Sequence, residues 1–310
     1  MKIIDKIIHP RYQKLVLLDK VYNGKAPSDI LVLGDSVMER VARQDTDKRS
    51  LGEMIHDGLK QDGYSTTVLS GTGYHPDIFY HLIKALSCMK HHPRLIVYPV
   101  NLRCFSPQWH LNPAWQYHDE IRAIERYQDE KCIVRVKHVS RDKMQDFRNS
   151  IVEYPAINLK TVGSFLDTIA APPVLDGEEQ ARKKILFIFH YMHPLVPWHQ
   201  KLVAITMSLF WARKLGMKVL LYLTPVNDQA GVRFVGSKFY SQVNANVEVV
   251  GSAVDTYLET GLVRWCDWST SFDSDQFFYP DLATEHLAQA GRLDLASRII
   301  KSAVNFIRIH

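Results

Sequence analysis

The sequence contains little cysteine, with four cysteines among 310 residues and no CxxC pair. The four positions are Cys88, Cys104, Cys132 and Cys266. Neither a disulfide-built scaffold nor a zinc site built on cysteines fits so few and so widely spaced residues. We therefore expect reduced thiols, no metal, no other cofactor and a cytoplasmic protein.

Long hydrophobic runs are also lacking. Charges at Lys2, Asp5 and Lys6 interrupt the amino-terminal segment. The longest apolar stretch elsewhere, Leu202 to Trp211, has about ten residues, whereas a helix that spans a bilayer needs about 20. The sequence therefore predicts neither a signal peptide nor insertion into a membrane.

No strong charge of one sign is present. The 38 Lys and Arg residues exceed the 33 Asp and Glu residues by a net charge of +5, and they are scattered. Glycine (15) and proline (14) are not enriched, and no internal repeat is visible. This composition is that of an ordinary globular protein, and it shows no nucleic-acid module.

What is present is an alternation of short apolar runs with amphipathic segments. The runs predict strands at Ile30–Leu33, Thr66–Leu69, Leu95–Val100, Lys218–Leu223 and Leu262–Cys266. Helical periodicity predicts helices at Leu51–Leu59, Ile78–Met89, His199–Leu215, Ala253–Glu259 and Leu287–Ile307. Strands that alternate with helices in this way predict a mostly parallel central sheet with crossover helices on both faces, an α/β three-layer sandwich.

The pattern blurs in the middle of the chain, where charge and proline are frequent. We predict helices around Asp119–Arg126 and Asp142–Ile151, followed by a loop near Ala170–Gly177. The chain is expected to form a single domain over residues 1–310, with a largely helical insertion or cap at approximately 105–194. Insertions above such a sheet often shape a substrate pocket.

Polar residues follow the predicted strands, and in parallel sheets ligands bind at this edge. Ser36 follows the first strand within Gly34-Asp35-Ser36, where it either acts as a nucleophile or caps a short helix. Gly71 lies in a glycine-containing turn after the second strand. Asn101 follows the third strand, where its amide either donates to an oxyanion or satisfies the loop backbone.

A histidine precedes the last predicted helix. His286 lies close to two carboxylates, Asp281 and Glu285, and Gly291 follows five residues later. A lone histidine is more often structural, but here one of the carboxylates could orient the ring. A histidine so placed can reach back to the edge of the sheet.

These blocks, taken in order, resemble the SGNH (GDSL-like) hydrolase family, which is named for its Ser, Gly, Asn and His blocks. The resemblance covers about Asp29–Cys104 and Lys218–Ala303. It implies the SGNH or flavodoxin-like sandwich, with Ser36 as nucleophile and His286 as general base. It also implies an oxyanion hole formed by the N–H groups of Ser36 and Gly71 and the side chain of Asn101.

The sequence departs from the family at the triad acid. The family has an aspartate three residues before its histidine, and this chain has Ala283 there. We expect Asp281 to orient His286 if the loop is longer, with Glu285 less favoured because an adjacent side chain rarely folds back onto its neighbour's ring. A Ser–His dyad oriented by a backbone carbonyl is the fallback.

Possible substrate contacts flank the blocks. Asp35 and Arg103 lie beside the serine and the asparagine, and Trp109 belongs to an aromatic cluster. The other members of that cluster are Phe105, Trp115 and Tyr117. Aromatic faces suit sugar rings, but they also build cores.

The resemblance implies an esterase or O-acyltransferase that acts, through a Ser36 acyl-enzyme, on an ester of a carbohydrate or another small molecule. An O-acetyl ester, with an acetyl donor as partner if the acyl group is transferred, is one candidate. An inactive SGNH-fold binding protein in polysaccharide or surface-glycan metabolism is the first alternative. A Rossmann-like nucleotide-binding enzyme is the second, although Gly34-Asp35-Ser36 lacks the G-x-G-x-x-G pattern.

Overall fold

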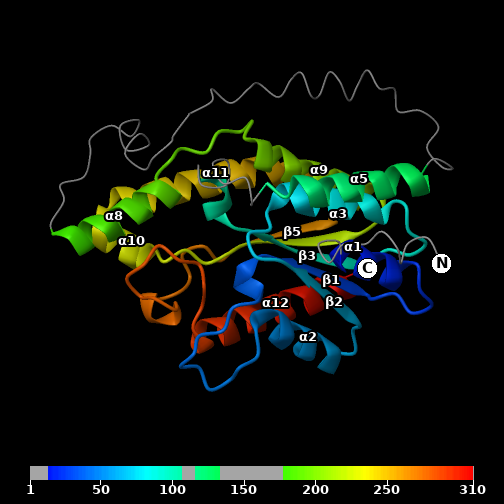
Figure 1. Cartoon of the computed structure of the whole chain (residues 1–310), viewed down its shortest axis with the longest axis horizontal. Helices are drawn as coiled ribbons and strands as arrows, with labels where there is room; N and C mark the ends of the chain where they lie inside the picture. Colours follow the sequence, from blue (N-terminus) through cyan, green and yellow to red (C-terminus); the bar gives the residue numbers. More distant parts are fainter. Residues whose placement is uncertain (1–12, 107–115, 133–176, 310) are drawn as a thin grey trace.

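The computed structural model describes residues 13–106, 116–132 and 177–309 and contains a five-stranded parallel sheet between two layers of helices (Figure 1). The strands lie in the order β2-β1-β3-β4-β5. They are β1 (Ile30–Gly34), β2 (Thr66–Ser70), β3 (Leu95–Val100), β4 (Lys218–Leu223) and β5 (Val263–Asp267). Every neighbouring pair is parallel. The predicted α/β three-layer sandwich is therefore confirmed.

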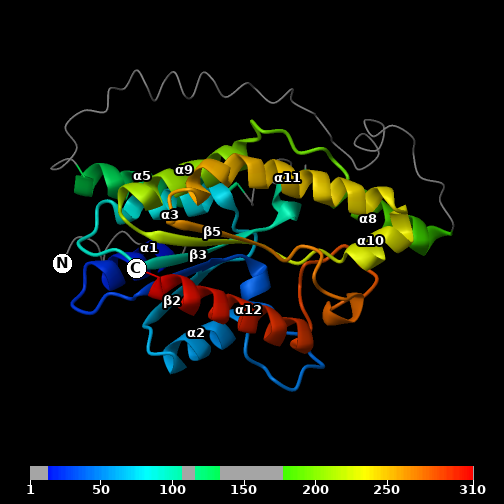
Figure 2. The ribbon, with the colours of Figure 1, turned by 180° about the vertical axis from the view of Figure 1, so that it is seen from behind.

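Helices cover both faces of the sheet (Figures 1 and 2). One face carries α2 (Leu51–Gln61) and α12 (Gln289–Arg308). The other carries α1 (Gln13–Tyr22), α3 (Pro76–Leu86), α5 (His118–Cys132), α9 (Gln200–Lys214) and α11 (Lys238–Leu258). Helices α8 (Glu178–Tyr191) and α10 (Asp228–Val235) extend this second layer beyond the end of β4. Short 3-10 helices are η3 (Ser36–Met38), η4 (Leu102–Phe105) and η6 (Ser274–Gln276).

The strands read as continuous apolar runs because both faces of the sheet are buried. In β1, Leu31 and Leu33 pack into the core beneath α3 and α9. Ile30 and Val32 point the opposite way, into the core beneath α2 and α12. The period-2 alternation of a strand thus divides one apolar run between two cores.

The structure differs from the predicted elements mainly in the helices. Helix α8 was not predicted, and α11 was predicted only at Ala253–Glu259 although it begins at Lys238. Its buried positions, such as Val243 and Val250, follow helical spacing, but the polar residue Asn246 lies between them in the same buried stripe and interrupts the apolar pattern. The helix predicted at Asp142–Ile151 lies outside the described residues. The insertion at approximately 105–194 stays a prediction.

The cysteines correct one expectation. Cys88 is disulfide-bonded, whereas Cys104 and Cys266 are free thiols. Reduced thiols throughout were therefore the wrong prediction, since spacing in sequence does not show which residues folding brings together. Within the described ranges, no helix has the length and apolar character needed to cross a membrane.

Candidate active site

The candidate nucleophile lies directly after the buried strand β1. Ser36 begins η3, and the carboxylate of Asp35 caps this helix by accepting from the Val37 N–H at 2.8 Å. The cap is therefore Asp35, not Ser36, which leaves the serine hydroxyl for another partner. At Gly34, the last residue of β1, an added Cβ would lie 2.2 Å from Cγ of Met38, so the close packing of η3 against the end of the strand favours glycine.

The hydroxyl of Ser36 meets the imidazole of His286 across 250 positions of sequence. Ser36 Oγ lies 3.0 Å from His286 Nε2. The segment that carries His286 is held in place by the Phe278 N–H, which donates to the His286 carbonyl at 2.9 Å, and by an isolated antiparallel bridge between Phe277 and Leu287. A serine and a histidine at this distance have the geometry of a nucleophile and its general base.

The other ring nitrogen of His286 faces a hydroxyl. Thr284 Oγ1 lies 3.1 Å from Nδ1 and also accepts from the backbone N–H of His286 at 3.2 Å. We assign the proton to Nδ1, because a donor there satisfies Thr284 and leaves Nε2 free to accept from Ser36. The ring is thus oriented by a neutral side chain.

Asp281, which was expected to orient the ring, has other partners. Its carboxylate pairs with Arg233 and with Lys183, and about half of the side chain (48%) is exposed. The loop therefore turns Asp281 toward helices α8 and α10, and the expected extra length does not return it to the histidine. The residue that does contact the ring is Thr284, two positions before His286. No motif or spacing in the sequence indicates that this threonine orients the histidine.

Glu285 is buried and pairs with a buried arginine. Its Oε2 accepts from Arg103 Nη1 at 2.8 Å. Burial raises the pKa of Glu285, but the charge of Arg103 and the hydrogen bond that Arg103 donates act against burial, and that pKa lies below its ordinary value. Glu285 is therefore an anion beside the histidine. Its side chain is turned to Arg103 and does not fold back onto the adjacent ring.

The electrostatic environment keeps His286 neutral. Burial is the main cause that lowers the pKa of His286 below its ordinary value, and the positive charges of Arg40 and Arg103 lower it further. The charge of Glu285 acts in the opposite direction. At neutral pH the imidazole is consequently unprotonated at one nitrogen, which is the state that a general base requires.

Asp35 and Asn101 form a buried bridge between β1 and β3. Asn101 Nδ2 donates to Asp35 Oδ2 at 2.9 Å, and Asn101 Oδ1 accepts from the Arg103 N–H at 3.0 Å. Burial, followed by the charge of Glu285, raises the pKa of Asp35 to about 6, although the Asn101 hydrogen bond opposes this shift. Asp35 is as buried as Asn101, and its carboxylate accepts from the Asn101 amide and the Val37 N–H; its role as a substrate contact stays a prediction.

Of the three predicted oxyanion donors, Gly71 is engaged elsewhere. Its N–H donates to the Gly34 carbonyl at 3.2 Å and so continues the β1–β2 ladder. The glycine is needed for another reason, because an added Cβ would lie 2.6 Å from the ring of Tyr74. The Asn101 amide has a second N–H beyond the one given to Asp35. That proton and the Ser36 N–H stay the candidate donors.

The structure describes two of the four residues of the predicted aromatic cluster, Phe105 and Tyr117. Phe105 is buried and packs edge-on against His199, with ring centroids 5.1 Å apart. Tyr117 packs edge-on against Tyr74. Trp109 and Trp115 lie outside the described residues. An aromatic ring that the sequence did not indicate, Phe278, lies against His286 with ring centroids 5.8 Å apart.

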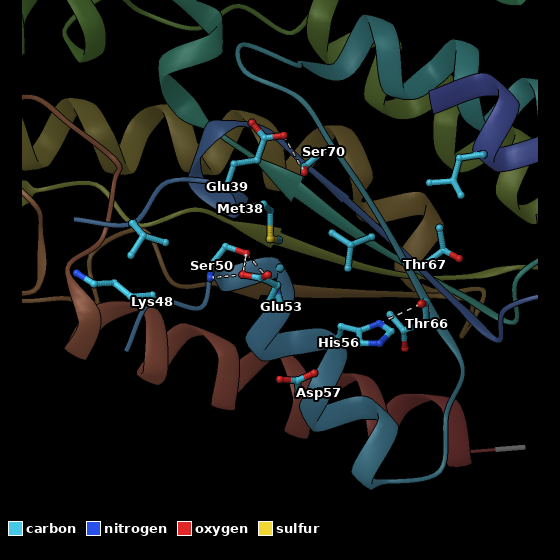
Figure 3. Close-up of a pocket in the computed structure, with 14 residues that line it drawn as sticks. Met38, Glu39, Lys48, Ser50, Glu53, His56, Asp57, Thr66, Thr67 and Ser70 are labelled. Carbon is cyan, nitrogen blue, oxygen red and sulfur yellow. Dashed lines mark hydrogen bonds between the residues drawn. The ribbon is translucent and has the colours of Figure 1, made fainter. Parts of the chain in front are cut away.

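A groove of about 670 Å³ runs beside η3 along the edge strand β2 (Figure 3). Its lining includes Met38 and Glu39, and it continues past Ser70 to His56 on α2. Glu39 accepts from Ser70 Oγ at 3.1 Å, and Figure 3 shows this contact at one end of the groove. Neither Ser36 nor His286 lines it.

In the described part of the chain, no group of three potential ligands could hold a metal ion.

Comparison with known proteins gave matches among solved structures only. No family model and no curated protein matches the chain. A single-residue variant of Axe2, an acetyl-xylooligosaccharide esterase from Geobacillus stearothermophilus, is 11% identical with a TM-score of 0.42, and 94% of this chain and 97% of that one are covered. A protein named as a candidate GDSL-like lipase from Parabacteroides merdae is 10% identical with a TM-score of 0.40, and 90% of this chain and 97% of that one are covered.

Proposed function

We propose that this protein is a serine-dependent esterase or O-acyltransferase that forms an acyl-enzyme on Ser36. The observation that carries the proposal is the 3.0 Å contact between Ser36 Oγ and His286 Nε2, at the carboxyl end of a parallel sheet. The lowered pKa of His286 supports it, because the ring is then a base at neutral pH.

In the first half of the reaction, Ser36 Oγ attacks the ester carbonyl while its proton passes to His286 Nε2. The carbonyl oxygen becomes an oxyanion. The Ser36 N–H and the free N–H of the Asn101 amide are the proposed donors to it. One such donor typically contributes roughly 3 kcal/mol to the transition state. The bridge from Asn101 to Asp35 supports this role, because it fixes the amide before substrate arrives.

In the second half, the bond between the former carbonyl carbon and the oxygen of the leaving alcohol breaks, and His286 gives its proton to that oxygen. An incoming hydroxyl then attacks the Ser36 ester, again with His286 as base, and Ser36 is regenerated. Water as the acceptor yields a carboxylic acid and hence an esterase. A sugar hydroxyl as the acceptor yields a new ester and hence an O-acyltransferase, which needs an acyl donor such as an acetyl ester.

The groove beside η3 is the proposed location for the remainder of a carbohydrate or other polar substrate. Its lining carries a carboxylate at Glu39 and hydroxyls at Ser70 and Ser50. Such groups hydrogen-bond to sugar hydroxyls. Carbohydrate O-acetyl esters are therefore the first substrates to test. Arg103 stays a proposed substrate neighbour, although its guanidinium is already paired with Glu285.

A second candidate is a binding protein that keeps the SGNH fold without turnover. The observation that favours it is the neutral oxygen of Thr284 in place of a carboxylate on His286 Nδ1. A neutral acceptor orients the ring but does little to stabilise the imidazolium that forms during the reaction.

A fluorophosphonate probe, which phosphonylates activated serines with loss of fluoride, distinguishes the two. The esterase proposal expects labelling of the folded wild-type protein that is lost in both Ser36→Ala and His286→Ala. Turnover of p-nitrophenyl acetate should be lost in the same two variants. Wild-type protein that neither reacts with the probe nor hydrolyses the ester would leave the binding protein as the better description.

The cytoplasmic location also stays a prediction. The disulfide at Cys88 counts against it, because disulfides persist mainly in oxidising compartments. Mass spectrometry of the protein isolated under alkylating conditions tests this point directly. Full alkylation of Cys88 without reduction would restore the cytoplasmic interpretation.

A further inference from the structure

A buried ion pair connects the loop that follows the nucleophile to the helix that follows the histidine. Arg292, in the first turn of α12, is 0% exposed. Its Nη1 donates to Asp45 Oδ2 at 2.6 Å. Asp45 is itself buried and lies nine residues after Ser36, in the loop between η3 and α2. The two residues are 247 positions apart in sequence.

The same guanidinium also holds backbone on both sides of this contact. Nη1 donates to the carbonyl of Leu287, the residue directly after His286, at 3.2 Å. Nη2 donates to the carbonyl of Asp47 at 2.9 Å. The three acceptors are reached from two different nitrogens in the fixed plane of one guanidinium, a geometry that the single nitrogen of a lysine does not reproduce.

Gln289 reinforces the connection from the beginning of α12. Its Oε1 accepts from the backbone N–H groups of Thr46 and Asp47, both at 2.8 Å, and from the Thr46 hydroxyl at 2.9 Å. In return, the Gln289 N–H donates to Asp45 Oδ1 at 3.3 Å. Figure 1 shows the loop passing the beginning of α12.

These contacts bracket the catalytic pair without touching it. The loop that they hold follows η3, the 3-10 helix that begins at Ser36, and the helix that they hold begins three residues after His286. We propose that Asp45, Gln289 and Arg292 are positioning residues that set the distance between Ser36 and His286, a role that rests on the proposed serine-dependent function. We refer to these three residues as the Asp45 clamp. A displacement of about 1 Å between reacting groups can lower a rate about 100-fold.

The test uses Gln289, because substitution of the fully buried Arg292 endangers folding. Gln289→Leu removes the acceptor oxygen, whereas Gln289→Glu retains one. Arg298→Ala is the matched control, because its pair with Asp294 lies on the same helix and does not reach the loop. Circular dichroism and thermal unfolding establish that each variant is folded at the assay temperature.

With p-nitrophenyl acetate, Gln289→Leu is expected to lower kcat by about 10- to 100-fold with KM within about twofold of wild type. Gln289→Glu and Arg298→Ala should retain kcat. A variant that is only less stable, but folded at the assay temperature, should keep the kcat of wild type. Unchanged kcat in folded Gln289→Leu would overturn the proposal.

A second measurement does not depend on turnover. The His286 imidazole is titrated by NMR in each variant. Gln289→Leu should move the His286 pKa back toward its ordinary value as the ring loosens, and the other two variants should titrate like wild type. If wild-type protein neither hydrolyses esters nor reacts with the probe, the proposed function fails, but this titration still tests whether the Asp45 clamp positions His286. An unshifted His286 titration in Gln289→Leu would refute the positioning role of the clamp.

Discussion

The hydroxyl of Thr284 lies 3.1 Å from Nδ1 of His286, where a serine hydrolase triad carries a carboxylate. The same hydroxyl accepts from the His286 backbone N–H, so the ring and its own peptide share one acceptor. The nearest anion along the chain, Glu285, is turned to Arg103. Orientation and negative charge are thus supplied to His286 by two different residues, and each can be removed separately.

Removal of the orienting hydroxyl should impair the base without removing it. Thr284→Val deletes the acceptor for Nδ1–H, so the ring loses its preferred tautomer and orientation. We expect kcat for ester hydrolysis to fall by about 100-fold, the lower end of what general base catalysis contributes. Thr284→Ser, which retains the hydroxyl, should keep most of the rate. Equal rates for the valine and serine variants would show that Thr284 does not orient the ring.

The pH profile should report the charges around His286. In the proposed mechanism the neutral imidazole is the active form, so kcat/KM should fall as the pH drops through the His286 pKa, which lies below its ordinary value. Arg40→Gln removes a positive charge that disfavours the imidazolium, so the acid limb should move to higher pH. Arg43→Gln, at another exposed arginine of the same loop, is the control. Movement of the limb to lower pH in Arg40→Gln would contradict this electrostatic picture.

The Arg103–Glu285 pair should matter for stability as well as for charge. The side chains are 18% and 4% exposed, so removal of one partner leaves a buried charge without compensation. We expect Glu285→Gln to lower the free energy of unfolding by about 3–5 kcal/mol in urea denaturation. The double variant Glu285→Gln/Arg103→Met should recover part of this loss.

A surface pair provides the comparison for that measurement. The Arg298 and Asp294 side chains are 34% and 35% exposed, and the pair is expected to contribute no more than about 1 kcal/mol. Arg298→Ala should therefore lower stability far less than Glu285→Gln. Similar losses in the two variants would mean that burial of the Arg103–Glu285 pair is energetically unimportant.

Gly34 should not tolerate a side chain. A Cβ there would lie 2.2 Å from Cγ and 2.8 Å from Cβ of Met38, inside the 3-10 helix that carries Ser36. Gly34→Ala should cost about 1–3 kcal/mol of stability, as overpacking does, and should slow labelling of Ser36. Gly251→Ala in α11 meets no atom within 4 Å and should stabilise the helix by about 0.5–1 kcal/mol. Wild-type labelling of Gly34→Ala would show that η3 adapts freely.

The strands and the two central site residues could be predicted from the sequence because their signals are local. A run such as Ile30–Gly34 is apolar on both faces, and this pattern alone indicates a buried parallel strand. Ser36 follows that strand directly, and the edge at which it lies follows from the parallel order of the strands. His286 was indicated by its block before the last helix, and the structure places it on Ser36.

The hydrogen-bond partners were decided by the tertiary structure. Asp281 and Thr284 are both close to His286 in sequence, but the turn of the loop directs Asp281 to Arg233 and brings Thr284 to the ring. The Gly71 N–H is likewise committed to Gly34 by the pairing of β1 with β2.

Sequence alone thus determined the layered sheet and the edge at which its chemistry lies, because burial of apolar runs needs only local periodicity. The tertiary structure alone decided which oxygen orients His286, which amides are free and that Arg292 reaches Asp45. A hydrogen bond depends on distances of a few tenths of an ångström between segments, and in the Arg292–Asp45 contact those segments are 247 residues apart. Spacing along the chain does not encode such distances.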